Sequence, residues 1–125
     1  MKGVVVTTDF EVRVEDFADP LYKTVGAAVG GYIEIVHPFR LWHPFCMIVN
    51  EEGRLHGLPI NPVGSLLYGT DMHREPIVGD IVIMKDGYRN GEPDIVGLDD
   101  TEDVDRIRVL ASALAKALRK KGEST

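Results

Sequence analysis

The sequence predicts a single α+β domain, with a mixed or mainly antiparallel sheet, two short helices and a long C-terminal amphipathic helix. The chain has 125 residues, of which 44% are apolar, enough to bury one core of ordinary size. Its segments follow in the order β, β, α, β, β, β, α, β, α, without the strict alternation of a doubly wound nucleotide-binding fold. This order favours a sheet that carries its helices on one side.

The first segments have the pattern of a β-hairpin followed by a short helix. Residues 4–7 are β-branched, and residues 10–15 alternate apolar and charged side chains, with Asp9 at the turn between them. The Asp-Pro dipeptide at 19–20 predicts a helix start, with the aspartate as N-cap, and the Gly-Gly pair at 30–31 predicts its end. A glycine inside this helix indicates a close packing contact.

The middle of the chain predicts three strands around an exposed loop. Residues 32–36 and 45–49 are strand-like, and the prolines of residues 37–44 predict a semi-rigid loop between them. Residues 50–53 have the pattern of a tight turn, in which the asparagine can bond the backbone two residues on. Residues 54–58 are then expected to return as a hairpin partner.

The next segments are a helix, a strand and a polar stretch. The Asn-Pro dipeptide at 61–62 predicts a second helix start, and Gly69 predicts its end. Residues 77–84 form a strand pattern with a Gly-Asp bulge or kink inside it. Residues 85–100 are polar and rich in turns, so they form either a mobile loop or a loose hairpin through 94–98.

The last segment has the clearest helical pattern. Thr101 is the expected cap, with acidic residues in the first turn and basic ones in the last. The apolar positions are Val104, Ile107, Ala111, Leu114 and Leu118, widened by Leu110 and Ala117. Residues 1–98 are thus the predicted core domain, and residues 99–121 a helix that packs on this core or on a partner subunit. Residues 122–125 are expected to fray.

Composition excludes several function classes. The net charge of −6 and the scattered basic residues argue against direct nucleic-acid binding. No segment approaches the roughly 18 apolar residues of a membrane span, and no signal peptide pattern is present, so the expected place is the cytoplasm, or a host's cytoplasm. The single cysteine excludes an internal disulfide.

Motifs for catalysis, metals and cofactors are missing. The glycines of residues 26–31 end a helix, whereas a dinucleotide fingerprint opens one. Cys46 lies in an apolar strand, as inert core cysteines do. The spacing of the histidines disfavours a metal site. They are His37, His43, His56 and His73. We expect no catalytic residue, no metal and no cofactor.

Two groups of residues are candidates for ligand binding. If Ile33 and Ile35 face the core, Tyr32 and Glu34 share the other strand face, which is either solvated or lines a pocket. The second group places a cation, an imidazole and an amide just before a helix N-terminus, where anions bind readily. Its members are Arg54, His56 and Asn61. Asn61 as a plain N-cap is the alternative.

The proline-braced loop carries a candidate protein interface. Phe39, Trp42 and Phe45 are aromatic anchors that this loop would present with little loss of entropy. The alternative is that Trp42 folds over the core as a lid.

Residues 29–34 (VGGYIE) and 49–62 (VNEEGRLHGLPINP) resemble a family of short proteins of unknown function found in bacteriophages, plasmids and integrated elements. A glycine-containing strand at 77–83 completes the resemblance. The terminal helix lies beyond the residues that resemble the family and looks like an extension of its pattern. No catalytic residues come with the family. Its genomic context implies counter-defence, by blocking a host nuclease or sequestering a small nucleotide signal.

Three functions follow as hypotheses. The first is a non-enzymatic, homo-oligomeric binding protein of phage or mobile-element origin that sequesters an anionic small nucleotide. The second is a protein-binding inhibitor or interaction module that uses the aromatic loop or the C-terminal helix. The third is a small hydrolase using Glu34 and His56.

Overall fold

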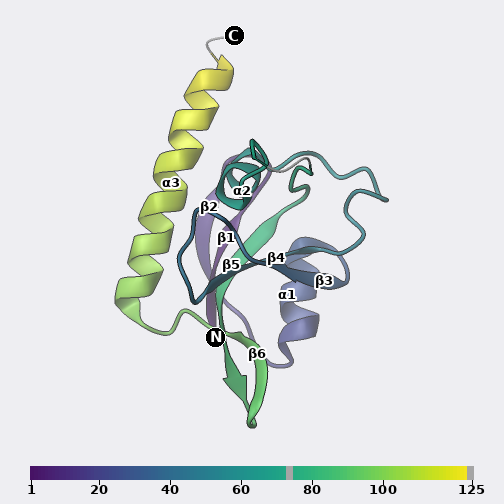
Figure 1. The fold of residues 1–125 in the computed structure, drawn as a ribbon, viewed down its shortest axis with the longest axis vertical. Helices are drawn as coiled ribbons and strands as arrows, with labels where there is room; N and C mark the ends of the chain where they lie inside the picture. Colours follow the sequence, from purple (N-terminus) through teal and green to yellow (C-terminus); the bar gives the residue numbers. More distant parts are fainter. Residues whose placement is uncertain (73–74, 124–125) are drawn as a thin grey trace.

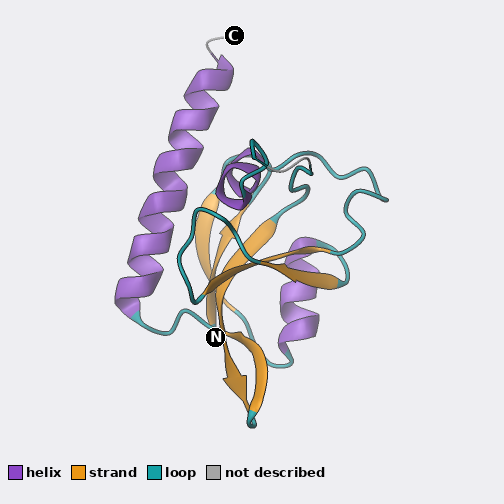
Figure 2. Cartoon of the chain, in the orientation of Figure 1, coloured by secondary structure: helices purple, strands orange, loops and turns teal. Residues whose placement is uncertain are grey.

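The structure, a computed structural model, describes residues 1–72 and 75–123 of the chain. His73 and residues 124–125, considered above, lie outside this part. Within it, six antiparallel strands form one sheet, and three helices pack against it (Figures 1 and 2). The elements are β1 (Lys2–Val6), β2 (Val12–Asp16), α1 (Leu21–Val29), β3 (Ile33–Val36), β4 (Phe45–Asn50), α2 (Pro62–Tyr68), β5 (Ile81–Arg89), β6 (Glu92–Val96) and α3 (Thr101–Glu123). The predicted α+β domain with a long C-terminal helix is confirmed.

The long strand β5 organises the sheet. Its first half lies between β1 and β4, where Ile83 is opposite both Val4 and Met47. Its second half pairs with β6. The order across the sheet is β2-β1-β5-β4-β3, so β2 and β3 end this path, while β6 pairs with β5 alone.

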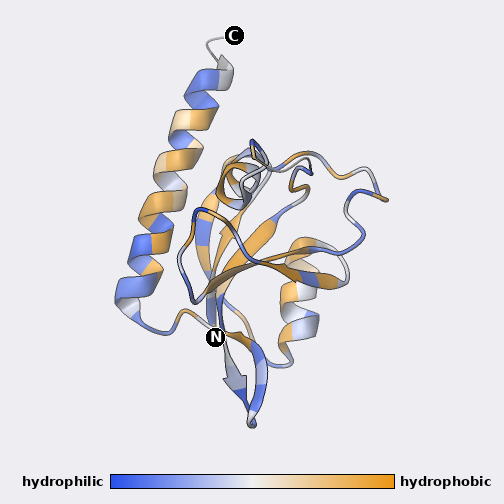
Figure 3. Ribbon diagram, viewed as in Figure 1, coloured by the Kyte–Doolittle hydropathy of each residue, from blue (hydrophilic) through white to orange (hydrophobic). Residues whose placement is uncertain are grey.

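Hydrophobic cores lie on both faces of the sheet, which corrects the expectation of helices on one side. One core, beneath α2 and α3, contains Val4 and Ile83, and the other, beneath α1, contains Val5 and Val82. Because successive strand residues point to opposite faces, central strands covered on both faces must be apolar at nearly every position. Figure 3 shows this continuous apolar colouring in the middle of the sheet.

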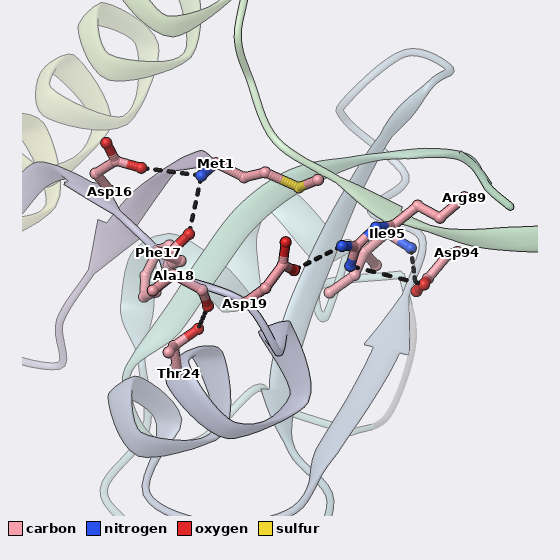
Figure 4. A network of polar contacts seen from close by, with 9 residues as sticks. All are labelled: Met1, Asp16, Phe17, Ala18, Asp19, Thr24, Arg89, Asp94 and Ile95. Atoms are coloured by element: carbon pink, nitrogen blue, oxygen red, sulfur yellow. Dashed lines mark hydrogen bonds and ion pairs between the residues drawn. The ribbon is translucent and has the colours of Figure 1, made fainter.

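The start of α1 is held by ion pairs and not by the expected aspartate cap. Pro20 occupies the N-cap position, and no side chain caps the helix. An oxygen of Asp19 instead accepts a hydrogen bond from Arg89 Nη2 at 2.6 Å, and the other Arg89 amino group lies 3.9 Å from Asp94 (Figure 4). These contacts tie α1 to the β5–β6 hairpin. At its other end α1 stops at Gly30, as predicted.

The segment after β4 forms consecutive turns, so the predicted strand at 54–58 is wrong. The backbone N–H of His56 donates to the carbonyl of Glu52 at 3.0 Å, and that of Leu58 donates to Gly53 at 3.0 Å. Backbone groups that bond within the segment are not available for a strand ladder.

The strand predicted at 77–84 is shifted along the chain. Gly79 has φ +77°, which breaks the extended path, and β5 begins after it. The β5–β6 hairpin turns through Asn90 and Gly91, whose φ values of 54° and 78° suit a tight two-residue hairpin turn. Of the two alternatives for residues 85–100, the hairpin is confirmed.

The helix α3 packs against the sheet of its own chain. The side chains that enter the core are those of Val104, Ile107, Ala111 and Ala115. The N–H of Glu102 donates to Asp100 Oδ1 at 2.8 Å, so Asp100 and not Thr101 supplies the capping oxygen. Near the helix end, Arg119 donates to the carbonyl of Asp9 at 3.0 Å. No described helix is long and apolar enough to cross a membrane.

Candidate functional site

A groove of about 600 Å³ lies beside the edge strand β3, between α1 and the turns that follow β4. We call it the tyrosine groove, because Tyr22 and Tyr32 line it while remaining 71% and 74% exposed. The complete lining is Tyr22, Lys23, Gly26, Ala27, Gly30, Gly31, Tyr32, Ile33, Asn50, Glu51, Glu52 and His56. Most of this surface is apolar, as in sites for small organic ligands.

Glycines at the end of α1 let backbone line part of the groove. A Cβ on Gly26 would lie 2.9 Å from the carbonyl oxygen of Gly31, and a Cβ on Gly31 would lie 3.1 Å from Asn50 Nδ2. Gly30 has φ +89°, a left-handed conformation that favours glycine. The close contact expected at the helical glycine is therefore confirmed, and larger residues are excluded here.

Asn50 fixes the turn that forms the opposite wall. Its Nδ2 donates to the carbonyl of Val29 at 3.2 Å, and its Oδ1 accepts from the N–H of Glu52 at 2.8 Å. The N–H of Glu51 donates to the carbonyl of Tyr32 at 2.8 Å. The predicted bond from asparagine to the backbone two residues on is confirmed, and it also joins the turn to the end of α1.

The electrostatics of the groove favour a cation. Glu51 and Glu52 are among the residues that line it, and the C-terminal end of α1 adds a partial negative charge. Lys23 is a cation in the lining, and His56 Nε2 lies 3.2 Å from a carboxylate oxygen of Glu52. A ligand with an apolar body and a positively charged or donor group matches this arrangement better than a phosphate does.

A smaller pocket of about 80 Å³ lies on the other face of β3. Ile33 packs against the core beneath α1, whereas Val36 packs against the opposite core and lines this pocket. The charged residues that line it are Glu34, Glu51, Arg54 and Glu75. We call it the acidic pocket, because its cation is already paired: Arg54 Nη1 lies 2.9 Å from Glu75 Oε1.

A second groove of about 610 Å³ adjoins the tyrosine groove, since Tyr22 and Ile33 line both. It extends to the ion-pair network of Figure 4, in which Arg89 is held by Asp19 and Asp94. As in the acidic pocket, the cation is paired within the chain, so the region around β3 offers carboxylates more readily than free positive charge.

Asn61 belongs to the scaffold and not to the site, which corrects its prediction as a ligand residue. It is 0% exposed. Its Nδ2 donates to the carbonyls of Val6 at 3.0 Å and Gly79 at 2.9 Å, and its Oδ1 accepts from the N–H of Gly64 at 2.9 Å. The alternative, a plain N-cap, is confirmed.

The other predicted ligand residues divide between the two cavities. Tyr32 and His56 both line the tyrosine groove, whereas Glu34 and Arg54 line the acidic pocket. The two residues of the hydrolase hypothesis, Glu34 and His56, thus line different cavities. Of the two residues whose core placement was the condition for this strand face, Ile33 packs against the core, whereas Ile35 is 40% exposed. Whether any of these residues binds a ligand stays a prediction.

Sequence reasoning missed Tyr22. The signal was present, because this tyrosine lies off the apolar stripe of its helix, where an exposed aromatic side chain needs a reason. That Tyr22 and Tyr32 line the same groove could not be predicted from the sequence, since it depends on how α1 packs on the sheet.

The aromatic loop separates into a core residue and two exposed ones. Phe45 is 3% exposed and belongs to the core, which removes it from the predicted interface. Trp42 packs edge-on against Phe45, with ring centroids 5.1 Å apart, and remains 49% exposed. Phe39 is 60% exposed, and the guanidinium of Arg40 lies 5.9 Å from its ring centroid. The guanidinium of Arg40 donates two hydrogen bonds to the carboxylate of Asp71, which raises the pKa of Arg40.

Within residues 1–72 and 75–123, no group of three or more His, Cys, Asp and Glu side chains could hold a metal ion. Cys46 is 0% exposed, and burial, together with the Asp86 carboxylate, raises the pKa of its thiol to about 12. A thiol that stays protonated is a poor nucleophile, so Cys46 is inert as expected.

Replacing Cys46 by Ala is expected to reduce the loss of stability at alkaline pH. In the unfolded chain the thiol titrates near 9.0, and in the folded chain near 12, so between these values the unfolded state binds fewer protons and stability falls as pH rises. Between pH 8 and pH 10 the wild type should lose about 1.4 kcal/mol more than Cys46→Ala in urea unfolding. Equal losses would show that the thiol ionises without unfolding.

Comparison with known proteins identifies one family. The family model described as "Domain of unknown function (DUF3846)" matches residues 1–107, which include the whole sheet and the first part of α3. No curated protein and no solved structure matches the chain.

Proposed function

Since the chain belongs to the DUF3846 family, whose function is unknown, we propose from its site that it is a binding protein and not an enzyme, with the tyrosine groove as its ligand site. The observation that carries this proposal is a largely apolar groove of about 600 Å³ lined by two exposed tyrosines. Tyrosine rings contribute large contact areas and stack on planar groups. The backbone at Gly30 and Gly31 allows a flat ligand to approach closely.

The charges of the groove define the class of ligand. Glu51 and Glu52 line it together with the negative end of α1. Cations bind favourably over aromatic faces and beside carboxylates. We therefore assign to the groove a planar or apolar group that carries a positive charge, such as a guanidinium, amidinium or amine.

The anionic nucleotide of the sequence-based hypothesis is the competing ligand. In its favour, the tyrosines suit a nucleobase, and Lys23 could meet a phosphate. Counter-defence by a phage or mobile-element protein rests on the resemblance of residues 29–34 and 49–62 alone. The acidic residues Glu51 and Glu52 in the lining oppose this ligand.

Replacing Tyr32 by Ala is expected to weaken the binding of benzamidinium, a planar aromatic cation, by about tenfold, because stacking and cation–π contacts are lost together. Titration followed by NMR measures the affinity and locates the perturbed residues. Glu52→Gln should also weaken binding, about threefold, because it removes a charge.

Tyr88→Ala is the matched control, since Tyr88 is 75% exposed and lies on the β5–β6 hairpin. It should leave the affinity for benzamidinium unchanged. The opposite result would be that benzamidinium does not bind, that cyclic dinucleotides do, and that Glu52→Gln raises their affinity. That result would assign the groove to the anionic ligand.

A second candidate function is protein binding through Trp42. This side chain is 49% exposed and, with Val109 and Ala113 of α3, lines an apolar depression of about 610 Å³. Exposed tryptophans beside apolar surface are frequent anchors of interfaces. If a host protein captured by the chain is lost in Trp42→Ala but retained in Tyr32→Ala, this second function gains support over the first.

A further inference from the structure

We propose that the partner bound at the tyrosine groove is an extended, basic peptide segment that pairs with the outer edge of β3. This inference rests on the proposed function and names the chemistry of its partner. The observation behind it is an open strand edge with a cavity on each face of the strand.

The outer edge of β3 carries backbone N–H and C=O groups that do not bond to β4. The carbonyl of Tyr32 accepts from the N–H of Glu51, and the register continues with Glu34 opposite Val49. Because hydrogen-bonded pairs alternate in an antiparallel ladder, the N–H and C=O groups of Ile33 and Ile35 point away from β4. No strand in the described part of the chain pairs with this edge, which lies at the outside of the sheet beside α1 (Figure 1).

The two cavities contact opposite faces of β3. Ile33 lines the tyrosine groove, and the next residue, Glu34, lines the acidic pocket on the other face. Side chains of a paired strand alternate between the faces in the same way. A peptide added to β3 would thus direct one side chain toward the tyrosines and the next toward the acidic pocket, as in peptide recognition by strand addition.

Charge selects a basic peptide. The carboxylates in the two cavities are those of Glu34, Glu51, Glu52 and Glu75. Among the cations, Arg54 is paired with Glu75 at 2.9 Å, and Lys23 lies in the groove. The four carboxylates outnumber these two cations, so Lys or Arg side chains of a partner meet an excess of negative charge around β3, whereas an acidic segment meets repulsion.

A second copy of the chain fits this edge less well. The antiparallel register that uses the outward groups of Ile33 and Ile35 in both copies places Glu34 opposite Glu34 of the partner subunit. Like charges directly opposite each other destabilise a strand pair. A charged residue on a short edge strand is a common protection against self-association.

The test uses a heptapeptide of alternating Lys and Val, acetylated and amidated at its ends, and fluorescence polarisation to measure its affinity for the full chain. We expect binding that weakens with added salt. A matched heptapeptide of alternating Glu and Val should not bind. Backbone amide shifts measured by NMR should be largest at Ile33 and Ile35.

Ile35→Pro separates strand pairing from binding in the groove. Proline removes an N–H that points away from β4, which an edge strand tolerates. The variant should bind the heptapeptide about tenfold more weakly and benzamidinium as well as the wild type does. If Ile35→Pro does not fold, two heptapeptides methylated on alternate sets of backbone nitrogens replace it. The set that faces β3 should lose binding, and the other set should keep it.

The outcomes distinguish the two proposals. If benzamidinium binds in the groove but the basic heptapeptide does not, or if both methylated peptides bind equally, strand addition is overturned while the proposed function stands. If neither probe binds, the proposed function fails with it. A dimer that Ile35→Pro dissociates would assign this edge to a second copy and overturn the basic peptide.

Discussion

Asn61→Ala is expected to lower the free energy of unfolding by about 3 kcal/mol, from the loss of the N-cap bond and of two donors to buried carbonyls. The side chain is 0% exposed and bonds the carbonyls of Val6 and Gly79 and the N–H of Gly64. It thereby joins β1, the approach to β5 and the start of α2. Urea unfolding followed by circular dichroism measures the change.

Asn61→Asp tests the two roles of this side chain separately. The carboxylate keeps an acceptor for the N–H of Gly64 but faces the carbonyls of Val6 and Gly79 without a donor. We expect it to be destabilised at neutral pH despite the intact cap. The folded fraction of both variants should bind benzamidinium normally. Normal stability together with lost binding would return Asn61 to the ligand site.

Ile107→Ala should also lower the free energy of unfolding by about 3 kcal/mol, as is typical when a buried isoleucine is truncated. Ile107 is 1% exposed and packs in the core beneath α2 and α3. The effect follows because α3 completes the core of its own chain, although most of this helix lies beyond the matched residues 1–107. Thermal and urea unfolding measure it.

Val109→Ala is the matched control on the same helix. Val109 is 57% exposed, and its truncation should change stability by no more than about 0.5 kcal/mol. Two equally small effects would mean that α3 does not dock on the sheet in solution. A loss for Ile107→Ala that depends on protein concentration would indicate docking between subunits.

Local chemistry explains the elements that the sequence predicted well. Asn61 and Pro62 start α2, and Gly69 ends it in a left-handed conformation, because cap geometry depends on a few neighbouring residues. The same holds for the bond from Asn50 to the N–H of Glu52. The long stripe of α3 was predictable because its period extends over many turns.

The failed predictions concern groups with competing partners. Asp19 has the right position for a cap, but its carboxylate accepts a hydrogen bond from the guanidinium of Arg89, which is distant in sequence. Residues 54–58 have strand-like alternation, but their backbone bonds locally in turns. The competitor of Asp19 lies far away in the sequence, whereas residues 54–58 compete with a strand through bonds to their own neighbours, Glu52 and Gly53.

For the candidate site, too, some residues were predicted from the sequence and others were not. Tyr32 and His56 were candidates from sequence, and both line the tyrosine groove. Tyr22 was missed, and Glu34 and Arg54 belong to a different cavity from His56. Membership of a cavity depends on which residues distant in sequence pack together, and hydrophobic periodicity contains no such information.

By itself the sequence determined the class of the fold, both ends of α2 and the end of α1, an inert cysteine and an acidic chain. These follow from local backbone preferences, apolar periodicity and a count of charges, which neighbouring residues set. The tertiary structure alone decided that helices cover both faces of the sheet, that β3 is an open edge and that Tyr22 and Tyr32 line the same groove beside it. Those features come from strand order and helix docking, and they bring Glu51 and Glu52 into the lining of the groove between α1 and the turns after β4.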